Sequence, residues 1–102
     1  MDCVIRSFAN AAAEDLFNGV DSRRARRACP AALWPAVRRK LTQINRVRTI
    51  RELAVPPGNR LERLHGNRAG QYSIRVNDQF RLCFPWEDGY ADEVEVEVAD
   101  YH

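Results

Sequence analysis

The feature that most constrains the fold is a change in the spacing of apolar residues along the chain. Between Trp34 and Val47 the apolar side chains recur every three or four residues, which is the period of one helix face. From Tyr72 onward they alternate with polar residues, which is the period of a half-buried strand. Residues 56–59, Pro-Pro-Gly-Asn, break the chain between the two patterns. A helical part followed by strands predicts an α+β fold with an antiparallel meander.

Length and composition bound the number of domains and the class of protein. With 102 residues, of which 45% are hydrophobic and 29% charged, the chain has the composition of one globular domain spanning residues 1–102. No apolar run approaches the roughly 20 residues of a membrane span, and the N-terminus lacks a signal-peptide pattern. Cys3, Cys29 and Cys83 show neither a disulfide framework nor a metal spacing. We therefore expect a cytoplasmic protein with no metal, no cofactor and no membrane contact.

The N-terminal part is expected to hold a short strand and a capped helix. Residues 3–8, Cys-Val-Ile-Arg-Ser-Phe, read as a first strand. Asn10 can cap a helix over residues 11–18, and Gly19 suits its left-handed C-terminal exit. Residues 21–29 hold four arginines and almost nothing apolar, so we expect that segment to be exposed.

The helical period predicts a main helix over residues 34–47. Pro30 or Pro35 would lie in its first turn, where proline is tolerated. The sequence from Thr49 to Glu52 has the form of a capping box and predicts a further short helical turn.

The alternating half predicts a hairpin whose register decides where two arginines lie. Asn77-Asp78 is the turn signal between its strands. We favour an odd-length loop over residues 76–78, which pairs Ile74 with Phe80, because it keeps the large apolar residues on one face. Arg75 and Arg81 then share the opposite face of the sheet. After a second turn at residues 87–89, alternating Glu and Val predict a last strand.

Charge is divided sharply along the chain. Residues 1–81 carry all 16 basic side chains and 7 acidic ones, a net +9, whereas residues 82–102 carry 7 acids and no Lys or Arg, a net −7. Fifteen of the bases are arginine, whose planar guanidinium suits phosphate and carboxylate recognition. A body suited to a polyanion is thus followed by an acidic tail. The alternative reading is a compositional bias toward arginine with an acidic edge strand, and the facing of Glu93, Glu95 and Glu97 stays open.

Few residues are suited to acid–base chemistry. The sequence contains no phosphate-binding glycine loop, no zinc spacing and no nucleophile elbow. The titratable candidates are Glu62, His65 just before a polar loop, several arginines, and the last three residues, Asp100, Tyr101 and His102. RNA cleavage without a metal needs a group for the 2′-hydroxyl proton, a cation for the phosphorane charge and an acid for the leaving oxygen. The residue types present meet these needs.

A longer pattern resembles a known family. Residues 55–84, which run from Val-Pro-Pro-Gly-Asn through Leu-His-Gly to Arg-Leu-Cys-Phe, resemble the HigB-type toxins of the RelE/ParE superfamily, as do the opening Ile-Arg-Ser-Phe and the closing Asp-Tyr-His. The resemblance implies a small RelE-like α+β fold, with an antiparallel-dominated twisted sheet packed against two N-terminal helices. It also implies a type II toxin that cuts messenger RNA in the ribosomal 30S A site without a metal. Its partner would be a HigA-like helix-turn-helix antitoxin, through which the pair would bind operator DNA.

The resemblance also implies which residues are catalytic. The family's catalytic arginine falls on Arg81, and its C-terminal acidic, aromatic and imidazole residues fall on Asp100, Tyr101 and His102. The family's basic residue before the loop glycine is commonly lysine, and here it is His65. A histidine is only partly charged near neutral pH, so it suits proton transfer but binds phosphate more weakly.

A second group of arginines is expected to hold the RNA backbone. Arg68 and Arg75 would help to stabilise phosphate charge, and Arg63 is assigned to the same RNA-binding group. Arg23 and Arg24 would grip RNA electrostatically, form a solvated stretch, or dock an acidic antitoxin segment.

Two other classes of function stay open. A ParE-like toxin would share the fold but poison DNA gyrase, and it would need no acid–base residues. A catalytically inactive module would only bind its antitoxin, and the histidine at position 65 is compatible with that. Arg81 and the Asp-Tyr-His ending favour the ribonuclease.

Overall fold

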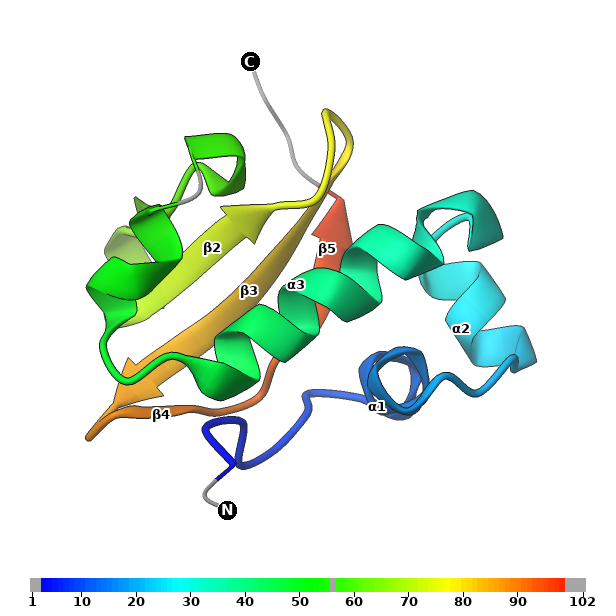
Figure 1. The fold of residues 1–102 in the computed structure, drawn as a ribbon, viewed down its shortest axis with the longest axis horizontal. Helices are drawn as coiled ribbons and strands as arrows, with labels where there is room; N and C mark the ends of the chain where they lie inside the picture. Colours follow the sequence, from blue (N-terminus) through cyan, green and yellow to red (C-terminus); the bar gives the residue numbers. More distant parts are fainter. Residues whose placement is uncertain (1–2, 56, 99–102) are drawn as a thin grey trace.

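Helices come first along the chain and strands follow, as Figure 1 shows for the computed structural model. The structure describes residues 3–55 and 57–98. The elements within these residues are α1 (Ala11–Asn18), α2 (Arg23–Ala28), α3 (Trp34–Arg46), β1 (Glu62–Arg63), β2 (Gln71–Arg75), β3 (Phe80–Glu87), β4 (Tyr90–Ala91) and β5 (Glu95–Val98), with the 3₁₀ turns η1 (Ala31–Leu33), η2 (Ile50–Ala54), η3 (Pro57–Asn59) and η4 (Gly66–Arg68). The predicted α+β class is confirmed. No helix among the described residues combines the length and apolar character that crossing a membrane requires.

Local capping signals fix α1 as predicted. The side-chain oxygen of Asn10 accepts a hydrogen bond from the amide of Ala13 at 2.9 Å, which satisfies a donor at the start of the helix. Gly19 ends the helix with a φ of 74°, in the left-handed region that favours glycine. The predicted bounds, residues 11–18, are therefore confirmed.

The exposed segment predicted over residues 21–29 contains a helix, α2, that the sequence analysis missed. The hydroxyl of Ser22 caps it by accepting a hydrogen bond from the amide of Ala25 at 3.1 Å. Ala25 and Cys29 are buried one turn apart, whereas the four arginines between residues 23 and 27 are exposed as expected. Two small apolar residues are enough to seat this helix, but they give almost no periodic signal.

The turn after α3 forms as predicted, but without the predicted capping box. Thr49 makes no side-chain cap hydrogen bond to η2. The carboxylate of Glu52 instead accepts a hydrogen bond from the amide of Arg48 at 2.8 Å, one residue before the expected position. The tighter 3₁₀ geometry of η2 accounts for this difference, because the reciprocal box belongs to an α-helical first turn.

The first strand predicted over residues 3–8 is not a continuous strand. The segment makes two isolated parallel bridges, from Ile5 to Ala91 and from Phe8 to Val94. Between the bridged positions Glu93 has a φ of 46°, so the facing backbone turns away and interrupts the ladder. The segment still fastens the end of the sheet to α3, because the amide of Ile5 donates to the side chain of Asn45 at 3.0 Å.

The sheet is antiparallel between all of its named strands. β1 pairs with β2, and β2 pairs with β3. The long β3 pairs with β5 along its first half and with β4 along its second half. Thus β3 lies at the centre, and residues of β2 and β5 flank it on either side (Figure 1).

The hairpin register differs from the prediction by two residues. Ile74 lies opposite Leu82, not opposite Phe80. The loop spans residues 77–79, because the side-chain oxygen of Asn77 accepts hydrogen bonds from the amides of Gln79 and Phe80 at 2.9 and 2.8 Å. A shift of two keeps every side chain on its face, so the expected segregation of the apolar residues holds.

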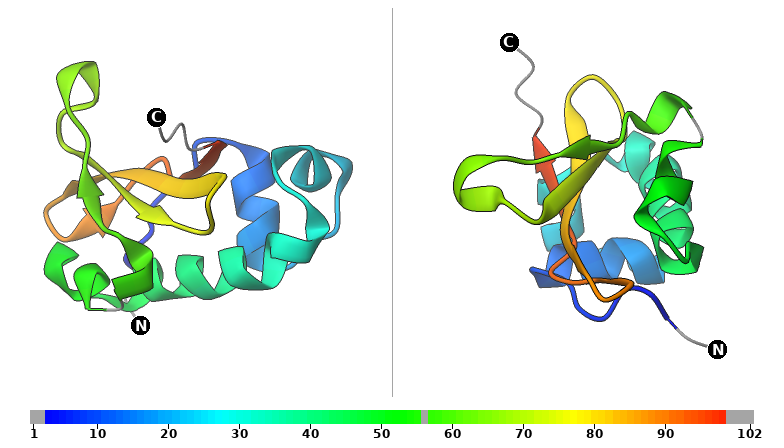
Figure 2. Two further views of the ribbon diagram at one scale, coloured as in Figure 1. Left: turned by 90° about the horizontal axis from the view of Figure 1, so that it is seen from above. Right: turned by 90° about the vertical axis from the view of Figure 1, so that its left-hand side faces the viewer.

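One face of the sheet packs against α3, which crosses in front of β3 and β5 in Figure 1. The contact is made by fully buried side chains of α3, β2 and β3, namely Val37, Leu41, Ile44, Ile74, Leu82 and Phe84. Burying each such side chain is worth about 1.5–3 kcal/mol relative to leaving it in water. This apolar face leaves the opposite face of the sheet for polar residues, and η4 stands out on that opposite side (Figure 2).

Candidate functional site

The sheet face turned away from α3 gathers the charged residues of three strands. Arg75 in β2 lies opposite Arg81 in β3, and Arg81 lies opposite Glu97 in β5. The alternation that sends Leu82 toward α3 sends its neighbours to this side. We use the name polar face for this surface and its residues Arg68, Ser73, Arg75, Arg81, Cys83, Glu95 and Glu97.

Arg68 crosses from η4 to β5 and binds Glu97 through both arms of its guanidinium. Its Nη1 donates to Oε1 of Glu97 at 2.9 Å, and its Nη2 donates to Oε2 of the same carboxylate. Nε and Nη2 also donate to the side-chain oxygen of Gln71 at 3.3 and 3.0 Å. Every nitrogen of this guanidinium therefore has a partner within the protein.

Arg81 lies in the same cluster but is much less completely bonded. Its Nη2 donates to Oε1 of Glu97 at 3.4 Å, a long hydrogen bond. Its Nε is buried and has no hydrogen-bond partner among the described residues. A buried donor without a partner costs about 1–3 kcal/mol, so a rearrangement of Arg81 that brings an acceptor to this nitrogen would be favourable.

Arg75 is held near the hairpin loop. Its Nη2 donates to the carboxylate of Asp78, and its side chain is 24% exposed, whereas that of Asp78 is 86% exposed. Such a pair with an exposed acid is weakly bound. Arg75 can therefore turn toward a ligand at low cost.

Burial and ion pairing shift the titration of the polar face in opposite directions. The guanidinium of Arg68 lowers the pKa of Glu97 to about 2. Burial raises the pKa of Glu95, and the neighbouring negative charge of Glu97 adds to the rise. Burial, with the nearby carboxylate of Glu97, raises the pKa of Cys83 to about 12. The Cys83 thiol is thus kept protonated, and a protonated thiol is a poor nucleophile.

Three of the predicted catalytic residues lie outside the described residues. These are Asp100, Tyr101 and His102, which follow β5 in the sequence. His65 is exposed and directly precedes η4, where it makes no side-chain cap. Arg63 is exposed on β1.

The other two predicted RNA-binding arginines are not brought to the polar face cluster. Arg23 and Arg24 belong to α2, which lies at one end of the molecule, while β1 and η4 lie at the other (Figures 1 and 2). Nε of Arg24 donates to the buried carboxylate of Asp15 at 2.6 Å, and the hydroxyl of Ser22 donates to the same oxygen. These bonds lower the pKa of Asp15 and give Arg24 a structural contact.

Sequence reasoning did not assign a site role to Glu95 or Glu97. Both face the predicted phosphate-binding arginines, since Glu97 pairs with Arg68 and Arg81 and Glu95 lies 3.9 Å from Nη2 of Arg68. Their alternation with Val94, Val96 and Val98 was the available signal, because it puts the acids on the face opposite the core. Among residues 3–55 and 57–98, no group of three His, Cys, Asp or Glu side chains is placed to hold a metal ion.

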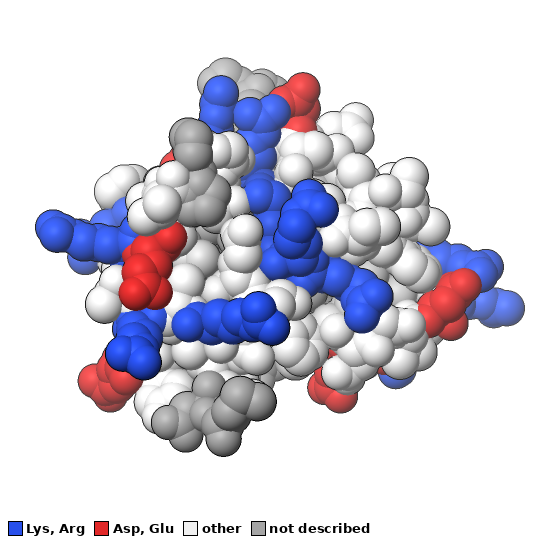
Figure 3. All heavy atoms as spheres, viewed as in Figure 1, with Lys and Arg blue, Asp and Glu red and all other residues white. Residues whose placement is uncertain are grey.

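The side of the molecule covered by α3 is strongly basic. Figure 3 shows lysine and arginine side chains gathered across it. Arg38, Arg39 and Arg46 of α3 are exposed, and in the described part of the chain none of them forms an ion pair. Part of the charge excess of the first 81 residues is thus displayed on the side opposite the polar face.

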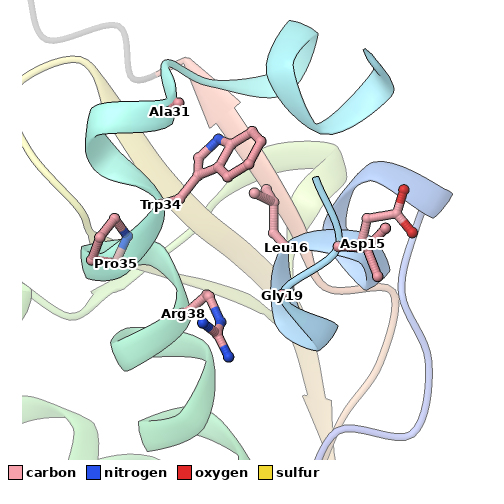
Figure 4. A pocket seen from close by; sticks show the side chains of 8 residues that line it. Asp15, Leu16, Gly19, Ala31, Trp34, Pro35 and Arg38 are labelled. Carbon is pink, nitrogen blue, oxygen red and sulfur yellow. The ribbon is translucent and has the colours of Figure 1, made fainter. Parts of the chain in front are cut away.

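A pocket of about 290 Å³ lies between the end of α1 and the start of α3, away from the polar face (Figure 4). Leu16 and Trp34 give it apolar walls, and Arg38 lies at its rim. The indole nitrogen of Trp34 donates to the carbonyl of Cys29 at 3.1 Å, so this ring is fixed by the residue that follows α2. None of the predicted site residues lines this pocket.

Comparison with known proteins places the chain among toxins. The family described as RelE-like toxin of type II toxin-antitoxin system HigB matches residues 6–102. Toxin HigB-1 of Vibrio cholerae serotype O1 is 46% identical over 65 residues, which cover 64% of this chain and 68% of that protein. An uncharacterized protein of Haemophilus influenzae is 34% identical over 73 residues, 72% of each chain. The family match includes the whole polar face and the three C-terminal residues.

Proposed function

Because this chain belongs to the HigB family of RelE-like toxins of type II toxin–antitoxin systems, we propose that it is an endoribonuclease that cuts messenger RNA on the ribosome without a metal and thereby inhibits translation. The observation that carries the proposal is the state of Arg81. It is central on the polar face and has a buried Nε with no partner among the described residues. A phosphate oxygen is the acceptor that this donor fits best.

The reaction needs no cofactor because RNA contains its own nucleophile. The 2′-oxygen attacks the adjacent phosphorus, the bond from phosphorus to the 5′-oxygen breaks, and the products carry a 2′,3′-cyclic phosphate and a 5′-hydroxyl. One proton leaves the 2′-oxygen and one is added to the 5′-oxygen. Arg81 stabilises the charge that develops on the phosphorane, and Arg75 and Arg63 add positive charge along the RNA.

The proton transfers are assigned to the two histidines. Both His102 and His65 carry an imidazole, a group that can donate and accept a proton near neutral pH. Tyr101 stacks on or orients a nucleotide, as aromatic faces do in RNA sites. Asp100 orients its neighbours, since a carboxylate next to the scissile phosphate would repel it.

The family implies a cognate antitoxin. We propose a HigA-like helix-turn-helix antitoxin that neutralises the toxin and carries it to operator DNA. Its substrate, mRNA in the 30S A site, places its action in the cytoplasm. A domain of 102 residues offers little surface for reading RNA sequence, so the ribosome supplies much of the substrate positioning. Arg23 and Arg24 stay predicted contacts to RNA or to the antitoxin.

The test compares wild type with Arg81→Ala on ribosomes stalled with a defined messenger. Toe-printing should show A-site cleavage by wild type and a loss of cleavage in R81A, with an unchanged circular dichroism spectrum. Arg51→Ala removes an exposed arginine from η2 and should cleave normally. Full cleavage by R81A would refute the assignment of Arg81.

Two parallel assays address the other classes. Inhibition of gyrase supercoiling without mRNA cleavage would identify a ParE-like poison. Normal growth of bacteria expressing the chain without its antitoxin, with intact mRNA, would identify a catalytically inactive binding module. The proposal predicts growth arrest, relieved by co-expression of the neighbouring antitoxin gene.

A further inference from the structure

The most fully bonded arginine of the polar face does not have the geometry of a substrate ligand. All three nitrogens of Arg68 are already used by Glu97 and Gln71. To bind a phosphate, this guanidinium would have to break a bidentate ion pair whose side chains are only 30% and 22% exposed. Breaking a half-buried charge-assisted pair costs more than freeing a surface one.

The pair joins two parts of the chain that are distant in sequence. Arg68 ends η4, and Glu97 lies in β5, 29 residues later. In the sheet, β2 and β3 lie between β5 and the strand that precedes η4. The contact therefore spans the polar face from one side to the other and passes close to Arg81, which shares Oε1 of Glu97.

Both connected segments lead to residues that the proposed reaction uses. His65 directly precedes η4, and Asp100 follows Glu97 by three positions in the sequence. η4 stands out from the sheet (Figure 2), and its internal backbone bonds are a 3.3 Å contact to His65 and a 3.2 Å contact to Gly66. Such a short turn has little packing of its own to fix its direction.

We propose that Arg68 and Glu97 form a positioning pair, which fixes η4 against β5 and Arg81 so that His65 meets the phosphate that Arg81 holds. This inference rests on the proposed ribonuclease function. Glu97 also sets Arg81 itself, because the shared oxygen draws its Nη2 to one side and leaves Nε for the substrate. The pair acts through other residues and touches no RNA.

The experiment is a double-mutant cycle measured as single-turnover cleavage on programmed ribosomes. Arg68→Gln and Glu97→Gln should each lower kcat by about 10- to 100-fold, the size expected when catalytic groups are misplaced by a fraction of an ångström to 1 Å. KM should stay within about twofold, because neither residue binds RNA. The double variant should be no worse than either single variant.

Rescue and a control separate positioning from lost stability. The exchanged pair Arg68→Glu with Glu97→Arg should recover part of the kcat lost in Arg68→Glu alone. Arg6→Gln breaks a pair that also joins distant segments, with Arg6 2.6 Å from Asp92, and should leave kcat unchanged. Hydrogen exchange without ribosomes should show faster exchange of the Ala69 amide in E97Q and unchanged exchange of core amides.

The outcomes distinguish this inference from the proposed function. If wild type does not cleave mRNA, both are overturned. If wild type cleaves and R68Q keeps its kcat but raises KM, Arg68 binds RNA directly and only the positioning inference falls. If E97Q raises RNA affinity without lowering kcat, Glu97 merely competes with phosphate, and the positioning inference again falls.

Discussion

The two faces of one sheet are built from alternate residues of the same strands, yet they are held by different forces. Ile74, Leu82 and Phe84 on the apolar face are fully buried against α3. On the polar face, Arg68 of η4 and Arg81 of β3 both donate to the carboxylate of Glu97 in β5. The apolar contact is non-directional and tolerates small shifts, whereas guanidinium–carboxylate contacts demand particular angles.

The difference assigns stability to the apolar face and the proposed chemistry to the polar face. On the apolar face, the surface removed from water contributes directly to the free energy of unfolding. On the polar face, desolvation offsets much of the ion-pair attraction, so its charges add little net stability. A domain of this size has few buried residues to spare, and the half-buried polar cluster is best explained by a functional requirement.

The largest expected effect is on the apolar face. Phe84→Ala should lower the free energy of unfolding by about 3–5 kcal/mol, because it removes a fully buried aromatic side chain and leaves a cavity. Urea denaturation followed by tryptophan fluorescence measures the change. Phe84→Leu should cost less, and a loss below about 1 kcal/mol for F84A would show that the core collapses around the gap.

The next effect belongs to the polar face and concerns rate instead of stability. Arg81→Lys keeps the positive charge but loses the planar fork and the Nε donor. We expect single-turnover kcat to fall by about 10²- to 10³-fold, the cost of removing one oriented donor to a developing oxyanion. Thermal unfolding should change little. Wild-type rates in R81K would mean that charge alone suffices and that the orphaned Nε has no catalytic role.

Much of the fold followed from short-range signals. Asn10 and Gly19 marked the ends of α1, and the three- and four-residue spacing from Val37 to Ile44 marked the buried side of α3. Caps and apolar periods are local, so the sequence contains the whole signal. α2 was not predicted, because its main buried apolar residues are only Ala25 and Cys29. This helix depends on tertiary packing, which leaves no periodic pattern in the sequence.

Contacts between residues distant in the sequence were harder to predict. The face on which Arg81 lies was predicted correctly, because alternating residues of a strand point to alternate faces of the sheet. The predicted hairpin register was wrong by two residues, because the hydrogen bonds that the Asn77 side chain accepts determine which residues form the loop. The partner of Arg68 could not be predicted, because no local rule brings residues 68 and 97 together. Asp100, Tyr101 and His102 remain assignments from the family resemblance.

Two carboxylates of the polar face, Glu97 and Glu95, should make the free energy of unfolding depend on pH in opposite directions. The pKa of Glu97 is lowered from 4.5 to about 2, so its stabilising contribution is complete above about pH 4.5 and is lost as the pH falls toward 2. The unfolding free energy of wild type should therefore fall more steeply over this interval than that of E97Q. If the unfolding free energies of wild type and E97Q fall equally with pH over this interval, the ion pair does not stabilise the folded protein.

Glu95 should act in the reverse direction. Its pKa is raised by burial, so its contribution is complete below its ordinary pKa of 4.5 and is lost as the pH rises through the folded-state value. Glu95→Gln should then be more stable than wild type at neutral pH and gain nothing in acid. Equal stability at neutral pH would show that Arg68, 3.9 Å away, fully offsets the burial of this carboxylate.

The smallest effect is expected where an ion pair lies on neither face of the sheet. Arg26 and Asp21 bond through two contacts of 2.8 Å, as good in geometry as those of the polar face, but their side chains are 66% and 57% exposed. Water and salt screen such a pair. Arg26→Gln should leave both the melting temperature and kcat within error of wild type. A clear loss of cleavage would place α2 in contact with RNA or the ribosome, and the chemistry would then no longer be confined to the polar face.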